Sequence, residues 1–354
     1  MMILNQLIIF PLAVAFLVAL VTTPLAIKLA WKWKLIDDPQ KRKHPAKLHQ
    51  KPIPRAGVIP VWLAVVTASL VFLPMDKYVL SILGGSTLLL ILGLLDDKYD
   101  LNPYLRLIGC FLAAGLVVGA GIRIFFITHP FGQGIIQFNQ LIAIVLALVW
   151  ISFLSNITNW SSGFDGQLPG MVVIAALTIT FLSFRFSADI TQWPVTILAA
   201  ITAGAYLGFL PYNFYPQKIM PGYGGGTLAG FLLAVLAILS TAKIGTTLVV
   251  LGIPLIDALY AIIRRLLTGR SPVWGDRGHL HHKLLDDWGW SKRKTALFYW
   301  GVTALLGILA LNLRSLQKFY TIVMLVIIIG SLLLWFNLLS VWFNQSGRDK
   351  PSKT

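Results

Sequence analysis

Charged residues and cysteine are both scarce in this sequence. Only 12% of the 354 residues are charged, whereas a soluble domain carries about 25%. Because 57% of the residues are hydrophobic, the composition excludes an ordinary soluble domain and indicates a membrane protein with several spans. The single cysteine, Cys110, excludes an intrachain disulfide.

Acidic residues are also few, with 13 Asp and Glu against 29 Lys and Arg, and the formal net charge is +16. Nucleic-acid binding is one explanation for a basic chain, but the long apolar runs argue against a nucleic-acid partner. The first lysine is Lys28, so a basic region before the first apolar run is missing. This absence favours a retained first span over a cleaved signal peptide.

Apolar runs recur along the whole chain, and a bilayer core needs about 20 apolar residues per helix. We predict about eleven membrane-spanning helices, at residues 6–30, 57–75, 79–95, 103–121, 138–155, 169–184, 194–212, 227–241, 243–265, 295–313 and 319–343. The expected fold class is an all-α polytopic membrane protein. Residues 1–354 are expected to form one integral membrane domain with a polar tail at 345–354, and alternating apolar residues within 122–138 predict a small hairpin.

Lysine and arginine predict which ends of the spans face the cytoplasm, because both are enriched in cytoplasmic loops. Residues 32–56 and residues 264–294 carry eight of them each, so both segments are predicted to be cytoplasmic. With eleven spans, the polar stretches at 96–100, 156–168 and 213–226 fall on the same side. The catalytic loops of an enzyme would therefore lie on the cytoplasmic face.

Three aspartates end the third apolar run, at Asp96, Asp97 and Asp100. If the helix continues by one turn, Asp96 and Asp100 share a face and Asp97 lies about 100° away. Crowded carboxylates repel one another and attract a divalent cation, or a phosphate held through that cation. The alternative is a solvated helix end that is acidic by chance.

Two loops add polar side chains of a kind that binds ligands. In the first loop, His49 and Arg55 can address a phosphate, and the alternative is a basic anchor for anionic lipid headgroups. After the fifth span, Asn156, Asn159 and Asp165 lie in a loop that also contains glycine. Their oxygens suit Mg²⁺ and sugar hydroxyls, and the alternative is an ordinary helix-to-loop connection.

Two later stretches are rich in glycine or histidine. The glycines at 224–226 precede an expected helix start, which resembles an anion-binding nest, and a flexible turn is the alternative. Near Arg277 lie three of the six histidines: His279, His281 and His282. Zinc binding would suit imidazoles, but no cysteine supports it, so contact with a diphosphate is preferred over zinc or a solvated basic loop.

Asp257 lies inside the ninth predicted span, and an intramembrane carboxylate is a functional candidate by default. Pairing with Arg264 or Arg265 is the structural alternative. A transporter would need ionisable groups near the middle of the membrane, and Asp257 is the only candidate. Because the other polar groups fall on one face, a transporter ranks last among the hypotheses.

Together, the four polar stretches resemble in order and side the polyprenyl-phosphate N-acetylhexosamine-1-phosphate transferase family, glycosyltransferase family 4. The resemblance covers nearly the whole chain to Lys283. It is closer to the undecaprenyl-phosphate N-acetylglucosamine-1-phosphate transferase branch than to the phospho-N-acetylmuramoyl-pentapeptide transferase branch. It implies transfer of a sugar 1-phosphate, with N-acetylglucosamine 1-phosphate expected, from a UDP-sugar to undecaprenyl phosphate with release of UMP. This would be a first membrane step in cell-wall or surface glycan synthesis.

The resemblance also implies Mg²⁺ or Mn²⁺ as cofactor and a bacterial-type cytoplasmic membrane as location, and dimers are common in that family. Asp96, Asp97 and Asp165 would form the catalytic centre and bind the metal ion. From the residues or from the resemblance, nine further residues are predicted to bind substrate: Asn156, Asn159, Asn213, Arg277, His279, His281, His282, His49 and Arg55.

Two positions depart from the family pattern, which has Asp where this chain has Ser162 and a metal-binding Asp where it has Tyr223. Neutral oxygens are poorer ligands than carboxylates for a hard cation. The leading hypothesis is an active transferase, because Asp96, Asp97, Asp165 and the histidines are retained. The alternative is a catalytically silent homologue that binds polyprenyl phosphate or a partner.

Overall fold

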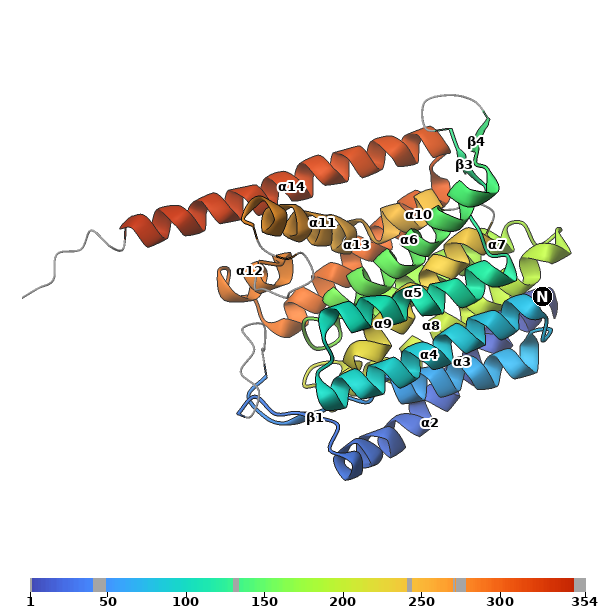
Figure 1. The fold of residues 1–354 in the computed structure, drawn as a ribbon, viewed down its shortest axis with the longest axis horizontal. Coiled ribbons are helices and arrows are strands. Elements are labelled where there is room, and N and C mark those ends of the chain that lie inside the picture. The colour runs from blue at the N-terminus through green and yellow to red at the C-terminus, as the bar shows by residue number, and fades with distance from the viewer. Residues whose placement is uncertain are drawn as a thin grey trace, which may run out of the picture.

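A computed structural model of the chain describes residues 2–40, 49–129, 134–240, 244–269, 271 and 278–346, with the backbone alone for 336–346. These residues form a bundle of long helices with two short strand pairs (Figure 1). The helices are α1 (Met2–Leu4), the π-helix η1 (Asn5–Ile9), α2 (Phe10–Trp33), α3 (Val58–Phe72), α4 (Lys77–Tyr99), α5 (Pro103–Ala120), α6 (Gln140–Trp160), α7 (Gln167–Phe184), the 3₁₀ helix η2 (Ile190–Gln192), α8 (Trp193–Asn213), α9 (Gly222–Leu239), α10 (Ile244–Val250), α11 (Gly252–Leu267), α12 (Leu280–Asp286), α13 (Lys292–Asn312) and α14 (Ser315–Ser346).

Nine helices of the described chain are long and apolar enough to cross a membrane, and the bent pair α10–α11 would make a tenth. The prediction of an all-α polytopic membrane protein is therefore confirmed. Each of the eleven predicted spans overlaps a helix or helix pair, although α3 has only 15 residues. The outer helices expose large apolar side chains, for example Leu17, Val21 and Leu25 on α2, as expected of a surface that faces lipid.

The ninth span is not one straight helix, contrary to the prediction for residues 243–265. It breaks between α10 and α11, which meet at an angle of 82°. Gly252 and Pro254 follow the break. Proline lacks the N–H that would continue the helix ladder of α10, but it is tolerated in the first turn of a new helix. Asp257 therefore lies on α11, beyond the bend.

Helices α7, α8 and α9 form the centre of the bundle, and all residues of α9 from Gly222 to Ala237 are buried. Helix α9 packs against α6 and α4, while α8 packs against α2 and α7. A Cβ on Gly93 of α4 would lie 2.3 Å from the Cα of Gly224, so these two helices touch backbone to backbone. The glycines at 224–226 do not precede the helix or form a flexible turn, because they lie inside α9, where they allow helices to approach closely.

The two strand pairs lie at opposite ends of the bundle (Figure 1). Strands β3 (Phe126–Thr128) and β4 (Ile135–Gln137) are antiparallel, with Ile127 opposite Ile136, which confirms the predicted hairpin. Strands β1 (Ile36–Asp37) and β2 (Ile53–Pro54) were not predicted, and they close the first loop at the end that also carries α12. The backbone N–H of Met220 donates to the carbonyl of Pro54, so β2 is tied to the segment before α9.

Candidate active site

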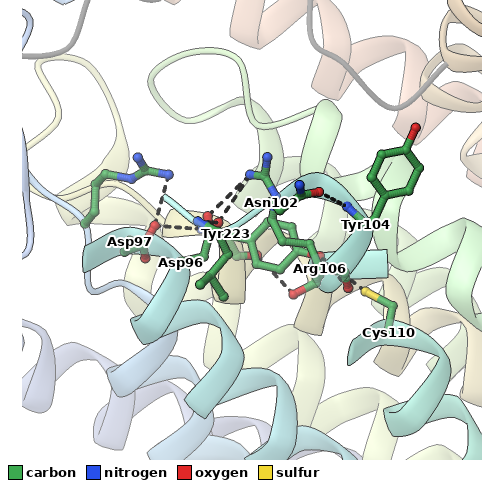
Figure 2. A network of polar contacts seen from close by, with 10 residues as sticks. Asp96, Asp97, Asn102, Tyr104, Arg106, Cys110 and Tyr223 are labelled. Atoms are coloured by element: carbon green, nitrogen blue, oxygen red, sulfur yellow. Dashed lines mark hydrogen bonds and ion pairs between the residues drawn. The ribbon is translucent and has the colours of Figure 1, made fainter. Parts of the chain in front are cut away.

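The last turn of α4 buries Asp96 and Asp97 almost completely. The Oδ1 atom of Asp97 lies 3.0 Å from Nη2 of Arg55 and accepts a hydrogen bond of 3.1 Å from the backbone N–H of Tyr223 (Figure 2). Its Oδ2 atom is buried and has no hydrogen-bond partner among the described residues. Buried carboxylate oxygens are normally hydrogen-bonded, so this oxygen is a candidate for contact with a ligand.

Gly222 explains how α9 comes so close to Asp97. Its φ angle of 70° lies in the left-handed region that glycine adopts without strain, and a Cβ there would lie 2.1 Å from Asp97 Oδ2. The carboxylate therefore sits at the first turn of α9, where unpaired backbone N–H groups favour negative charge. The same contact holds Asp97 in place and leaves its second oxygen against bare backbone.

Asp96 points to a different partner. Its Oδ1 atom lies 3.4 Å from Nη1 of Arg106 on α5 and accepts a hydrogen bond from the N–H of Leu101. Asp100 does not join it, because α4 ends at Tyr99 and Asp100 turns into the left-handed conformation with an exposed side chain. The helix therefore does not continue through Asp100, which was the condition for Asp96 and Asp100 to share one helical face.

A second cluster forms around Asp165, in the loop before α7. Asp165 is buried, and its Oδ1 accepts a hydrogen bond of 3.0 Å from Nζ of Lys292, the first residue of α13. Its Oδ2 accepts one of 3.1 Å from the N–H of Gln217. Asn213 accepts from the N–H of Gly166 and donates to the carbonyl of Ile219. Asp165 and Asn213 thus join the loop before α7 to the segment between α8 and α9.

The three histidines of the fourth stretch are buried at the start of α12. The ring of His281 lies 4.3 Å from that of His282 and 5.9 Å from that of Phe164, measured between centroids. A Cβ on Gly163 would lie 2.2 Å from His281 Nε2, so His281 contacts the loop that carries Asp165. Burial, followed by the neighbouring imidazoles, lowers the pKa of His281 well below its ordinary value, which keeps the ring neutral.

The other predicted residues lie at the border of these clusters or apart from them. Asn156 donates to the carbonyl of Ser152 in its own helix, and Asn159 packs against Gly226 of α9. His49 lies 3.8 Å from Asp37 of β1. Arg277 lies outside the described residues.

Comparison with known proteins identifies the family. A sequence profile of glycosyl transferase family 4 matches residues 79–241. A protein of Mycobacterium tuberculosis (strain CDC 1551 / Oshkosh), named decaprenyl-phosphate N-acetylglucosaminephosphotransferase, is 30% identical over 283 residues, and the match covers 71% of this chain and 69% of that protein. The chain belongs to glycosyl transferase family 4.

Two further relatives refine the likeness within glycosyl transferase family 4. A Bacillus subtilis (strain 168) protein, named "Probable undecaprenyl-phosphate N-acetylglucosaminyl 1-phosphate transferase", is 29% identical over 329 residues, 90% of this chain and 89% of that protein. A Geobacillus kaustophilus (strain HTA426) phospho-N-acetylmuramoyl-pentapeptide-transferase is 28% identical over 337 residues, 88% of this chain and 98% of that protein. The closer likeness to the N-acetylglucosamine branch is confirmed.

Tyr223, the residue that departs most from the pattern of family 4, packs beside both α4 aspartates. Its hydroxyl donates to the carbonyl of Arg106 and lies 3.4 Å from the Cys110 sulfur, while the Arg106 guanidinium lies 5.4 Å from the ring centre (Figure 2). Its ring thus supports the arginine that pairs with Asp96. Ser162, the second departure, is half-buried and contacts Asn159 through its backbone N–H.

Members of family 4 generally depend on a divalent metal ion. In the described chain, no three His, Cys or Asp side chains are grouped so as to hold one, and a metal site shared by Asp96, Asp97 and Asp165 stays a prediction. The segment before α9 and the first turn of α9 lie between the two clusters, since Gln217 in the segment bonds Asp165 and Tyr223 in the helix bonds Asp97. Asp97 Oδ2 still fits Mg²⁺, which usually takes one or two carboxylates and completes its shell with water and substrate phosphates.

The sequence motifs did not include two residues that the structure places at these clusters, Lys292 and Arg106. Lys292 is the first of three basic residues at the N-terminus of α13, where the helix dipole disfavours positive charge. This unfavourable placement could have indicated that the basic residues have a partner or a function. Arg106 carried no such signal, because its pairing with Asp96 depends on how α4 and α5 pack.

Proposed function

We propose that this membrane protein transfers N-acetylglucosamine 1-phosphate from its UDP-sugar to undecaprenyl phosphate and releases UMP. The observation that carries the proposal is Asp97, a buried carboxylate held by Arg55 and the start of α9 with one oxygen left for a ligand. Family membership and the names of the relatives support the reaction class and the sugar.

On the acceptor side, an oxygen of the lipid phosphate attacks the phosphorus that carries the sugar. The bond from that phosphorus to the oxygen bridging toward uridine breaks, and UMP leaves with that oxygen. Asp97 Oδ2 receives a hydrogen bond or proton from the acceptor phosphate, and Arg55 and Arg106 offset negative charge beside it. Because phosphoryl transfer is mainly a matter of positioning and charge, these fixed groups supply what the step needs.

On the donor side, Asp165 and Asn213 hold the loop before α7 against the segment before α9. Lys292 contributes positive charge beside this pair, and neutral His281 offers a ring nitrogen near Gly163 for the diphosphate. A bound Mg²⁺ or Mn²⁺ would neutralise phosphate charge next to Asp97, with Asp96 as the second candidate ligand. Asn156, Asn159, His282, His49 and Arg277 remain proposed substrate-binding residues.

The active site must lie at a membrane surface, because the acceptor is a lipid and the donor is soluble in water. We place this end of the bundle at the cytoplasmic face of a bacterial inner membrane, because the two basic segments of the sequence flank it. Residues 1–354 are proposed to be one integral membrane domain. A homodimer is proposed on the family resemblance alone, and mass measurement of the detergent-solubilised protein would test it.

A catalytically silent homologue was the alternative suggested by Ser162 and Tyr223. The comparisons give it no support. The structure adds that Tyr223 still presents its backbone N–H to Asp97 and packs against Arg106, so the exchange leaves the two α4 aspartates held.

The deciding experiment measures UMP release by the purified protein in detergent, with UDP-N-acetylglucosamine and undecaprenyl phosphate, with and without Mg²⁺. Release that requires both the lipid and Mg²⁺ is the expected result. Absence of release with several UDP-sugars, from protein that is monodisperse and melts cooperatively, would overturn the proposal.

A further inference from the structure

Asp257 lies outside the machinery described so far, yet it has two well-defined contacts. Its Oδ2 lies 2.9 Å from Nδ1 of His279, and its Oδ1 accepts a hydrogen bond of 2.8 Å from the backbone N–H of Leu280. Leu280 is the first residue of α12, so the carboxylate anchors both the first histidine and the start of that helix. This outcome differs from the structural alternative, in which Asp257 would pair with Arg264 or Arg265.

The contact made by Nε2 of His279 determines which of its two ring nitrogens carries the proton. Nε2 lies 3.4 Å from Nη2 of Arg265, a side chain that can only donate hydrogen bonds. Nε2 must therefore accept, which leaves the proton on Nδ1, where it is donated to Asp257. Asp257, His279 and Arg265 are all buried, so each polar contact is made away from water.

This chain of contacts reaches the candidate site from both ends. The Arg265 guanidinium lies 5.5 Å from the ring centre of Trp160, the last residue of α6 and the neighbour of Asn159. The ring of His279 stacks on that of His281 at 5.7 Å between centroids, with an interplanar angle of 6°. A change in the tautomer or tilt of His279 would therefore disturb both Arg265 and His281.

We propose that Asp257 is a positioning residue, which acts through His279 to hold His281 and Arg265 in place for the nucleoside diphosphate. This inference rests on the proposed transferase function and assigns His279 a supporting role in place of direct substrate contact. Both ring nitrogens of His279 are engaged inside the protein, so the ring has no free nitrogen to offer a substrate.

The substitution Asp257→Asn tests the tautomer directly, because an amide has only one acceptor oxygen. If that oxygen keeps the N–H of Leu280, the amide NH₂ faces Nδ1 of His279 and forces its proton to Nε2. That proton would then oppose the donors of Arg265. Asn has nearly the size of Asp, so packing around α11 is preserved.

The first measurement is nitrogen NMR of protein with ¹⁵N-labelled histidine, in which His279→Gln identifies the His279 signal among the six histidines. We expect the wild-type signal to show a proton on Nδ1 and none on Nε2, and Asp257→Asn to move it to Nε2 or to a mixture. A wild-type His279 with its proton on Nε2 would overturn the proposal whether or not the protein is active.

The second measurement is a double-mutant cycle on UMP release, with Asp257→Asn, His279→Gln and both together. Each single change should lower kcat by about 10- to 100-fold with little change in KM, the range seen for outer partners of catalytic groups. The double mutant should be no slower than the slower single mutant, because the two residues act in series. Multiplying effects would show that Asp257 does not act through His279.

Two controls separate this proposal from instability and from failure of the transferase assignment. Asp76→Asn removes another carboxylate that caps a helix, at the start of α4, and should leave kcat unchanged. Loss of kcat by Asp257→Asn in proportion to a fall in Tm would indicate a purely structural role and overturn the proposal. If the wild-type protein releases no UMP, the transferase assignment fails, while the NMR measurement still decides the contact itself.

Discussion

Asp97 and Asp165 are two buried aspartates at the same end of the bundle, and each is paired with one cation. They differ in what remains for a ligand. Asp97 keeps an oxygen without a partner among the described residues, whereas Arg55 and Tyr223 share the other one. Both oxygens of Asp165 are taken, by Lys292 and by the backbone of Gln217. Two aspartates that the sequence marks equally as catalytic candidates can therefore differ in whether an oxygen remains for a ligand.

The largest expected effect separates these two aspartates. Asp97→Asn should lower kcat for UMP release by about 10³-fold or more, because a neutral amide cannot accept a proton or neutralise a cation. Asp165→Asn should act chiefly on stability, with a loss of about 1–3 kcal/mol in the free energy of unfolding.

Initial rates and thermal melting of both variants in detergent would test this contrast. A kcat for Asp165→Asn as low as that for Asp97→Asn, at unchanged Tm, would remove the distinction between them.

The next largest effect is expected at Lys292, the cation that pairs with Asp165 in the second cluster. Lys292→Met should raise KM for UDP-N-acetylglucosamine about tenfold with a smaller change in kcat, because one charge-assisted contact to the diphosphate is lost. Lys294→Met is the matched control, since Lys294 sits on the same turn with its Nζ 4.1 Å from the ring centre of Trp290. Equal effects of the two substitutions on KM would point to general surface charge instead.

Substitutions of Tyr223, whose backbone N–H donates to Asp97, test whether the metal ion binds beside Asp97. Tyr223→Asp restores the carboxylate of the family pattern, so the half-saturating Mg²⁺ concentration should fall about threefold or more. Tyr223→Phe removes only the hydroxyl contacts with Arg106 and Cys110, and should cost about 1 kcal/mol of stability without changing the Mg²⁺ dependence. A half-saturating concentration that does not fall in Tyr223→Asp would place residue 223 away from the metal ion.

The smallest expected effect concerns His281 and pH. Its pKa in the folded protein is lowered by burial and by the neighbouring imidazoles, so the unfolded chain binds the proton more readily. Stability is therefore full above the unfolded pKa of about 6.5 and declines as the pH falls below it toward the folded value. His281→Gln should lose less Tm than the wild type between pH 7 and pH 5, with His129→Gln, which follows β3 at the opposite end of the bundle, as the control. A steeper acid loss in His281→Gln would contradict the assignment.

Much of the fold was predictable because membrane insertion depends on local composition. Runs of about 20 apolar residues predict helices wherever they occur, and the described helices overlap all eleven runs. The break before Gly252 was harder to foresee, because Pro254 sits in a sequence apolar enough to form one continuous span. Likewise, the glycines at 224–226 carried a turn signal, yet helix packing turned them into a contact surface for α4 and α6.

The sequence predicted which residues belong to the candidate site, but it did not predict which residues they contact. Asp97, Asp165, Asn213 and His281 were recognisable from motifs, and the structure brings each beside another predicted segment. Their partners were not recognisable. Lys292 is 127 residues from Asp165 in the chain, and His279 was expected to contact substrate, whereas it bonds Asp257.

Apolar runs and clustered basic residues, properties of the chain alone, determined that this protein spans a membrane and that its polar motifs gather at one end. Only the tertiary structure decided which aspartate keeps an oxygen without a hydrogen-bond partner among the described residues. Asp97 Oδ2 lies buried and without a partner because Gly222 brings the bare backbone at the start of α9 against it, and both oxygens of Asp165 are taken because α13 delivers Lys292 and the segment before α9 delivers Gln217. Hydrophobic partitioning is local to each run, whereas such pairings depend on how distant helices pack.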